Sequence, residues 1–221
     1  MSFDLDFFES MPVLGIIRGV KFNCLHGVVE ASLSGGLSYL EITQNTPDYI
    51  NFIQIINKEF PQAVVGAGTI LSVVDAQKAF DAGAKFLVAP GFNEEIAGFC
   101  VDKKLAYFPG ALTPTEIQKA WNSGATMVKI FPASQMGPAY FEQIKGPFDK
   151  IKLMAVGGVN PSNIKDYLNS GADAVALGGS IFSLKRMENR LFSEIQNDIE
   201  EFMFEVKNFY AKISSNNSIN C

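Results

Sequence analysis

Short apolar runs alternate with longer segments of helical pattern along the chain, and Gly, Pro, Asn and Ser separate them. The runs recur roughly every 20 to 25 residues, a spacing that suits one strand followed by one helix. They occupy residues 12–19, 39–43, 64–69, 86–90, 106–111, 127–132, 152–158 and 174–179. The pattern predicts a strand at each run and a helix in each interval.

Several of the predicted helices begin at capping signals. In "TPTE" (113–116), Thr113 can cap the helix, the proline suits its first turn and Glu116 completes a capping box. The segments "TPDY" (46–49) and "NPSN" (160–163) also place a proline directly after a capping residue, so Thr46 and Asn160 are expected to cap the helices that follow.

The repeated units predict the architecture. Eight of them in a row, without a composition break or a linker, indicate an α/β protein with a single closed (β/α)8 TIM barrel over residues 1–213. Residues from about 187 to 213 have the pattern of a long amphipathic helix, and 214–221 are expected to form a frayed tail. The alternative is an open doubly wound sheet. It is disfavoured because the units are even in size and no G-x-G-x-x-G follows the first run.

Composition narrows the function classes. The chain has 221 residues, is 48% hydrophobic and 19% charged, and carries a net charge of −5. This charge argues against a nucleic-acid partner, and the only local exception is the group Lys185, Arg186 and Arg190. No apolar run approaches the roughly 20 residues of a membrane span, and the N-terminal segment is acidic where a signal peptide would be basic. We therefore expect no membrane partner and a cytoplasmic location.

The cysteines and the histidine suggest no metal site. Cys24, Cys100 and Cys221 are odd in number and lack metal-like spacing, so free thiols in a reducing compartment are expected. The sole histidine, His26, lies in a helical stretch and is expected at the surface or in packing. No cluster of His, Cys, Asp and Glu has ligand spacing, which predicts a metal-free mechanism.

One lysine interrupts an apolar run. In "TMVKIFPAS" (126–134), Lys129 lies among residues that suit a strand covered on both faces. Burial disfavours the charged ammonium, so this lysine should have a lowered pKa and offer a neutral amine, which is a nucleophile for ketones. The alternative is a lysine at a strand end that reaches solvent or pairs with a carboxylate.

A carboxylate interrupts another run. Glu41 lies in "YLEIT" (39–43), and the active site of a barrel lies at the C-terminal ends of its strands. A carboxyl group buried there should have a raised pKa, as proton transfer near neutral pH requires. The alternative is a buried ion pair with Lys129 that has no catalytic role. Two opposite charges inside inner strands favour catalysis.

Glycines end the last two runs. Gly157 and Gly158 close the seventh run, and Gly178, Gly179 and Ser180 close the eighth. The loops after these strands form the usual phosphate site of a (β/α)8 barrel, where glycines allow backbone amides to approach an anion. The alternative is that these glycines only turn the chain.

Two polar residues are candidates for holding an acidic substrate. Arg18 lies near the end of the first run and Thr69 ends the third. Each could instead be an ordinary residue of the barrel rim.

Together these segments resemble a known family. The sequence is similar to class I aldolases that split 2-keto-3-deoxy-6-phosphogluconate (KDPG) or its galactonate epimer, some of which act on 4-hydroxy-2-oxoglutarate (KHG). The resemblance covers nearly the whole chain in the family's order and spacing. It rests on "IIRG", "LEITQNTP", "VVGAGT", "FPGALTPTE", "VKIFPA", "GPAYFEQIKGPF", "AVGGVNPSNI" and "ALGGS".

The resemblance implies a (β/α)8 barrel, usually a homotrimer, that acts on a phosphorylated keto acid and needs no cofactor. It implies that Lys129 forms the Schiff base and that Glu41 moves protons. It implies phosphate binding at the glycine and serine positions Gly157, Gly158, Gly179 and Ser180. Pro90 and Phe131, at the ends of the fourth and sixth runs, are also expected to contact substrate, as are Asn45 and Val156.

Two positions bear on specificity. Many gluconate-type members carry an arginine that grips the substrate carboxylate four residues after the glutamate, whereas this chain has Asn45. The carboxylate therefore needs another partner, for which Arg18 and Thr69 are candidates. Gluconate-type relatives commonly have a threonine before the paired glycines, whereas Val156 in "AVGGV" resembles the galactonate-type pattern.

Two other functions remain open from the sequence. A phosphosugar isomerase or a tryptophan-pathway barrel would share the phosphate glycines but would not need Lys129. A non-catalytic sugar-phosphate sensor would keep the barrel and would show no turnover.

Overall fold

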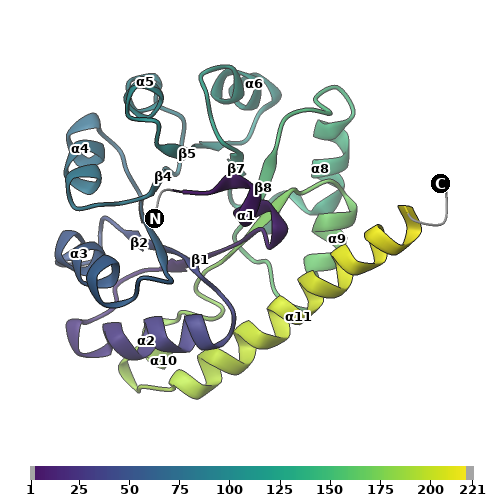
Figure 1. Cartoon of the computed structure of the whole chain (residues 1–221). Coiled ribbons are helices and arrows are strands. Elements are labelled where there is room, and N and C mark those ends of the chain that lie inside the picture. Colours follow the sequence, from purple (N-terminus) through teal and green to yellow (C-terminus); the bar gives the residue numbers. More distant parts are fainter. Residues whose placement is uncertain (1–2, 218–221) are drawn as a thin grey trace.

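The computed structural model describes residues 3–217, and its strands form one parallel sheet (Figure 1). The strands are β1 (Val13–Ile17), β2 (Tyr39–Thr43), β3 (Val64–Gly68), β4 (Phe86–Val88), β5 (Ala106–Phe108), β6 (Gly110–Ala111), β7 (Val128–Ile130), β8 (Leu153–Val156) and β9 (Ala174–Leu177). Each of the eight predicted runs contains a strand, and the fifth contains two.

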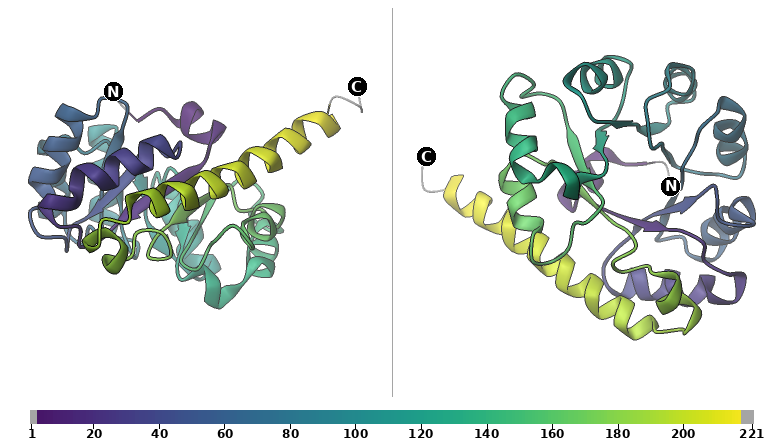
Figure 2. Two further views of the ribbon diagram at one scale, coloured as in Figure 1. Left: turned by 90° about the horizontal axis from the view of Figure 1, so that it is seen from below. Right: turned by 180° about the vertical axis from the view of Figure 1, so that it is seen from behind.

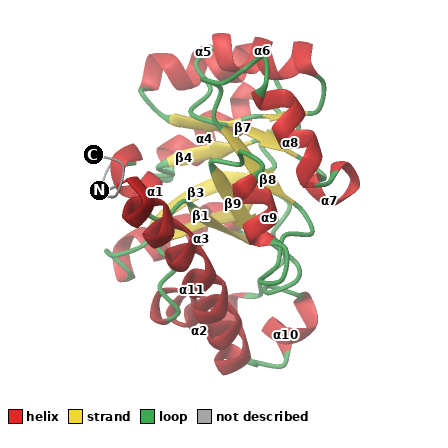
Figure 3. Ribbon diagram, turned by 90° about the vertical axis from the view of Figure 1, so that its right-hand side faces the viewer, coloured by secondary structure: helices red, strands yellow, loops and turns green. Residues whose placement is uncertain are grey.

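The helices follow the strands around the sheet (Figure 3). They are α1 (Leu5–Ser10), α2 (Phe22–Ser34), α3 (Tyr49–Glu59), α4 (Val73–Asp81), α5 (Glu94–Lys103), α6 (Pro114–Asn122), α7 (Ala133–Met136), α8 (Pro138–Lys145), α9 (Ile164–Asn169), α10 (Leu184–Glu188) and α11 (Phe192–Asn217). No helix among residues 3–217 is long and apolar enough to cross a membrane.

The sheet closes at the fifth run. The strand order is β5-β4-β3-β2-β1-β9-β8-β7-β6, so β5 and β6 stand at its two ends. The two strands are nevertheless neighbours in the chain, separated only by Pro109. β5 pairs with β4, β6 pairs with β7, and the carbonyl of Pro109 accepts a 2.8 Å hydrogen bond from the amide of Lys129. The predicted (β/α)8 barrel is confirmed, and the open doubly wound sheet is excluded.

The N-terminal end of the barrel is filled by apolar side chains. Helix α1 covers this end, and its Phe8 is fully buried, 4.8 Å from the ring of Tyr39 and 5.9 Å from that of Phe108 between centroids. Further inside, the barrel core includes Phe86 and Met154. Because this end is closed, the polar residues of the interior lie toward the C-terminal ends of the strands, where barrels carry their active sites.

The first and last long helices pack closely on each other. A Cβ on Gly27 of α2 would lie 2.5 Å from a ring carbon of Phe192 in α11, and a Cβ on Gly35 would lie 2.7 Å from a methyl group of Ile199. Glycine at these positions lets the two backbones approach. Figure 2 shows α11 crossing α2 and continuing past the edge of the barrel.

The last helix differs from the sequence expectation at both ends. Helix α10 ends at Glu188, Arg190 takes a left-handed φ of 54°, and α11 begins at Phe192, so the predicted start near Met187 is wrong. The helix then runs to Asn217, so residues 214–217 continue it. The rest of the predicted tail, 218–221, lies outside the described residues, and Cys221 with it.

The capping signals had mixed outcomes. The capping box of Thr113 and Glu116 is confirmed at the start of α6. The expectation for Thr46 is wrong, because α3 begins at Tyr49 and the Thr46 hydroxyl accepts a hydrogen bond from the amide of Gly19 instead. Asn160 does not cap a helix either, since α9 begins at Ile164.

Candidate active site

The structure brings Lys129 and Glu41 into the same end of the barrel interior. Lys129 is the middle residue of β7 and is 7% exposed, and Glu41 is the middle residue of β2 and is 1% exposed. The alternative of a lysine that reaches solvent does not hold. Among the described residues the two side chains form no ion pair, so the alternative of a direct buried ion pair is also not observed.

Burial sets the titration of both groups. Loss of hydration lowers the pKa of Lys129, the Glu41 carboxylate partly opposes this by favouring the ammonium, and the Arg18 guanidinium lowers the pKa further. Burial raises the pKa of Glu41, while the positive charges of Lys129 and Arg18 lower it. The Oε2 atom of Glu41 is buried and has no hydrogen-bond partner among the described residues. The protonation equilibrium of Lys129 is therefore shifted toward the neutral amine, and the Oε2 atom of Glu41 remains available to accept a hydrogen bond.

An aromatic ring lies near the amine. The Nζ atom of Lys129 is 5.2 Å from the ring centroid of Phe131, two residues along the same chain segment. Phe131 is 47% exposed, so its side chain is accessible to solvent while the amine is buried. Residues Pro90, Gly110 and Phe131 line one cavity of about 260 Å³ at the ends of β4, β6 and β7. The predicted contacts Pro90 and Phe131 thus share one cavity.

A glycine makes room for the glutamate. A Cβ on Gly68, at the end of β3, would lie 2.5 Å from Cγ of Glu41 and would overlap its Oε1. Gly68 was not among the site residues predicted from the sequence. The motif "VVGAGT" contained the signal, because a glycine inside a strand often marks a place where another group approaches closely.

Three polar residues join across the ends of the first three strands. Nη1 of Arg18 donates a 3.0 Å hydrogen bond to Oδ1 of Asn45, and Nη2 donates a 3.4 Å hydrogen bond to Oγ1 of Thr69. Thr69 has a left-handed φ of 59°, which is costly for a β-branched residue. Asn45 therefore holds the guanidinium that was expected to replace the family's arginine.

Backbone amides follow the last two strands. Gly157 and Gly158 have φ values of 96° and 81°, a region that favours glycine. Beside them, a Cβ on Gly179 would meet nothing within 4 Å, so the backbone there borders open space. The amides of Gly158, Gly179 and Ser180 have no acceptor in the part of the chain that the structure describes. Val156, at the end of β8, lies just inside this loop and is 3% exposed.

Three residues that were not predicted to belong to the site support this loop. Nδ2 of Asn163 donates a 2.9 Å hydrogen bond to the carbonyl of Gly158, and Nδ2 of Asn160 donates a 3.4 Å one to the same atom. A Cβ on Gly158 would lie 2.8 Å from Oγ of Ser134, so that serine faces the glycine from the β7 side. Asparagines before a helix are ordinary capping residues, which is why their other role was missed.

The remaining candidates lie elsewhere. His26 is exposed and forms a 2.7 Å contact with Glu59, and Cys24 and Cys100 are buried free thiols. Arg186, from the basic group noted in the sequence, pairs with Asp198. Within residues 3–217 no three His, Cys, Asp or Glu side chains form a group that could hold a metal ion.

Fold and site together define a (β/α)8 barrel whose interior holds a desolvated lysine and a buried carboxyl group. The chain belongs to the KDPG and KHG aldolase family, whose model matches residues 6–197.

Known proteins similar to the chain include both epimer types. A probable 2-dehydro-3-deoxy-6-phosphogalactonate aldolase of Rhizobium meliloti is 34% identical over 77% of this chain and 82% of its own length. A 2-dehydro-3-deoxy-phosphogluconate aldolase of Pseudomonas aeruginosa is also 34% identical, over 81% of this chain and 80% of its own. Overall identity therefore does not separate the two epimers.

A solved structure carries information on the chemistry. The KDPG aldolase of Legionella pneumophila, crystallised with pyruvate captured as a covalent carbinolamine, has a TM-score of 0.82 and 26% identity. It covers 89% of this chain and 96% of its own. A carbinolamine is the adduct that forms when an amine attacks a carbonyl carbon, before water is lost.

Proposed function

We propose that the protein is a class I aldolase that cleaves a 2-keto-3-deoxy-6-phospho sugar acid, the gluconate or galactonate epimer, to pyruvate and glyceraldehyde 3-phosphate. One observation carries the proposal: Lys129 is an almost fully buried amine with a lowered pKa that shares the barrel interior with Glu41. The similarity to an aldolase that holds pyruvate as a carbinolamine supports the same chemistry.

The lysine is proposed to begin the reaction. The neutral Nζ atom of Lys129 attacks the C2 ketone carbon, and the resulting carbinolamine loses water to form an iminium ion. The positive iminium nitrogen then accepts the electron pair of the C3–C4 bond as that bond breaks. This leaves the pyruvate part bound to the enzyme as an enamine and releases glyceraldehyde 3-phosphate.

Glu41 is proposed to move the protons. Its carboxylate removes the proton of the C4 hydroxyl group as the carbon–carbon bond breaks, and the carboxylic acid so formed can return a proton to C3 of the enamine. Water then hydrolyses the iminium ion, which releases pyruvate and regenerates the amine. The raised pKa suits both steps, since a strongly acidic carboxyl group would hold the proton too weakly.

The two ends of the substrate are proposed to bind different loops. Arg18, held by Asn45 and Thr69, suits the carboxylate because a guanidinium can donate two parallel hydrogen bonds. The amides of Gly157, Gly158, Gly179 and Ser180 suit the phosphate. Pro90, Phe131 and Val156 are proposed to contact the carbon chain between these ends.

Assembly and location belong to the same proposal. The family resemblance supports a homotrimer in the cytoplasm. Sedimentation velocity of the full chain measures the first, and a mass of one or two chains instead of three would contradict it.

Trapping tests the lysine directly. Borohydride added with pyruvate should reduce an imine onto Lys129, which peptide mass mapping would locate. Lys129→Arg should abolish both the adduct and turnover, because a guanidinium keeps its proton. An adduct on another lysine, or none, would overturn the mechanism. The absence of any adduct would favour the isomerase or sensor alternatives, whereas an adduct on another lysine would assign the Schiff base to that residue.

Turnover assays test the substrate. Pyruvate release should be measured from both epimeric phospho sugar acids and from 4-hydroxy-2-oxoglutarate, because the family model covers enzymes of both kinds. If the dicarboxylate is split faster than either phosphorylated acid, the phosphate assignment is wrong while the Schiff-base chemistry stands. Glu41→Gln should lower kcat on the preferred substrate by about 10² to 10⁴.

A further inference from the structure

A separate cleft lies at the end of the barrel opposite Lys129. It is formed by the connections from α4 to β4 and from α5 to β5, and these elements are labelled in Figure 1. Its volume is about 520 Å³. Three lysines line it, Lys85, Lys103 and Lys104, and part of its surface is apolar, from Phe3 and Phe80. The volume falls within the range of small-molecule sites, about 300 to 1,000 Å³.

The positive charge of this cleft is not neutralised by the protein. No carboxylate lines it, and among the described residues none of the three lysines forms an ion pair. The chain as a whole carries a net charge of −5. Three like charges around one cleft repel each other, and a bound anion would relieve that repulsion.

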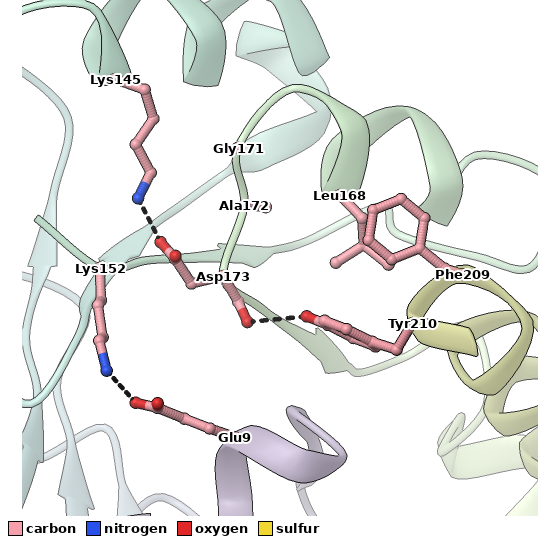
Figure 4. A pocket seen from close by; sticks show the side chains of 9 residues that line it. All are labelled: Glu9, Lys145, Lys152, Leu168, Gly171, Ala172, Asp173, Phe209 and Tyr210. Atoms are coloured by element: carbon pink, nitrogen blue, oxygen red, sulfur yellow. Dashed lines mark hydrogen bonds and ion pairs between the residues drawn. The ribbon is translucent and has the colours of Figure 1, made fainter. Parts of the chain in front are cut away.

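Another cleft at the same end of the barrel shows the contrast. This second cleft is lined by two lysines, each paired with a carboxylate. Lys145 lies 2.7 Å from Asp173, and Lys152 pairs with Glu9 (Figure 4). The lysines of that cleft are therefore matched by carboxylates of the protein. The first cleft, which we call the three-lysine cleft, has no such match.

The three-lysine cleft is also held in shape. Nζ of Lys103 lies 5.4 Å from the ring centroid of Phe80 and 5.9 Å from that of Phe99, so the ammonium group rests beside aromatic rings. The backbone is hydrogen-bonded on both sides, since the amide of Lys85 donates to the carbonyl of Val65 at 2.8 Å and the amide of Leu105 donates to the carbonyl of Cys100 at 2.8 Å. These contacts hold the backbone of the cleft and the ammonium group of Lys103 in place.

Lys104 occupies a backbone position that favours glycine. It caps the C-terminus of α5 with a left-handed φ of 54°, where glycine is the usual residue because it has no Cβ. The sequence keeps a lysine there in spite of this cost. A lysine near a helix C-terminus also interacts favourably with the helix dipole, so that simpler role has to be separated by experiment.

We propose that the three-lysine cleft binds a small organic anion with at least two negative charges on a flat apolar body, the chemistry of a nucleoside phosphate. The lysines would contact the phosphate groups, and the Phe3 and Phe80 side of the cleft would contact the base. The cleft lies at the closed end of the barrel, so the proposal does not depend on the aldolase reaction.

Calorimetric titration of the full-length protein tests this with three probes. ATP without magnesium should bind with a Kd below about 1 mM at low salt, and the affinity should fall as salt is added, because salt screens exposed charges. Tripolyphosphate, which lacks the flat body, and adenosine, which lacks the charge, should each bind more weakly. Absence of ATP binding at low salt would overturn the proposal, and so would equal binding of adenosine.

Three variants locate the site. Lys103→Glu and Lys104→Gly should each weaken ATP binding, the first by about tenfold or more because it reverses a charge. Lys104→Gly removes a charge without straining the backbone, so it should fold normally. The matched control is Lys150→Glu, which changes an exposed lysine before β8 at the same end of the barrel and should leave the affinity unchanged. ATP affinity that survives both cleft variants, or that falls equally in the control, would overturn the site.

Thermal melting distinguishes anion binding from the simpler role of the lysines, which is to stabilise the C-terminal end of α5. If Lys103→Glu lowers the melting temperature while ATP affinity stays as in the wild type, the lysines serve only the end of α5, and the proposal fails.

Discussion

The carboxylate of Glu41 occupies the space that a side chain on Gly68 would need. The two residues lie on adjacent strands, since Glu41 is in β2 and Gly68 ends β3. The position of the carboxylate is thus fixed partly by a missing Cβ on the neighbouring strand.

Gly68→Ala is expected to fold and to lose activity. Gly68 does not have a left-handed φ, so alanine fits the backbone, but its methyl group would push the carboxylate aside. A displacement of about 1 Å can cost about 10² in rate, so we expect a loss of this size in kcat. In a Glu41→Ala background the same substitution should have little further effect. An equal loss in both backgrounds would show that Gly68 acts on another group.

Two substitutions should shift the titration of Lys129 in opposite directions. The amine reacts only without its proton, so labelling of Lys129 by an amine reagent should rise with a midpoint below the ordinary value of 10.5. The Glu41 carboxylate favours the ammonium, so Glu41→Gln should move the midpoint to lower pH. The Arg18 guanidinium disfavours it, so Arg18→Ala should move the midpoint to higher pH. Shifts in the same direction, read by peptide mass mapping, would contradict the electrostatic account.

Arg18→Ala should separate the two ends of the substrate. Pyruvate carries the carboxylate and no phosphate, and loss of a charge-assisted hydrogen bond costs about 1.5 to 3 kcal/mol, so pyruvate binding should weaken by about 10- to 100-fold. Inhibition by inorganic phosphate should not change. Asn45→Ala should have a smaller effect in the same direction, because Asn45 only orients the guanidinium. If phosphate inhibition weakens and pyruvate binding does not, Arg18 serves the phosphate.

Val156→Thr tests the epimer preference. Valine has the shape of threonine without the hydroxyl group, so the wild type lacks one hydrogen-bond partner for a substrate hydroxyl. We expect the wild type to cleave the galactonate epimer at least as well as the gluconate one, and the substitution to favour gluconate by about tenfold, or about 1 to 2 kcal/mol. The comparison needs kcat/KM for both epimers in both proteins. A strong wild-type preference for gluconate that the substitution leaves unchanged would rule this out.

The regular part of the fold could be predicted from the sequence because it depends on local pattern. Every apolar run contains a strand, and Lys129 and Glu41 are buried as their neighbours indicated. The break between α10 and α11 was missed because it contains neither glycine nor proline, and Arg190 takes the left-handed conformation instead. The apolar pattern also gave no sign that the fifth run is divided. There, Pro109 separates β5, which pairs with β4, from β6, which pairs with β7.

The site was predictable only where a residue was unusual for its surroundings. A charged side chain in an apolar strand is such a signal. Thr46 carried no comparable signal, since a hydroxyl before a proline looks like a helix cap, and only the folded barrel brings the amide of Gly19 within 2.8 Å of it. The contact between Arg18 and Asn45 likewise joins residues 27 positions apart, and no local pattern encodes such a distance.

The pairing of β1 with β9 has a consequence for how the chain is made. During synthesis β1 emerges first, but the strand that completes its second edge is the last of the barrel, and α11, which packs on α2, follows later still. Until then the nascent barrel has open edges at both ends of its sheet, and open edges are where chains pair with the wrong partner. Ribosome-bound chains that stop before Ala174 should therefore be cut readily by protease, and resistance should arise only once α11 has left the exit tunnel.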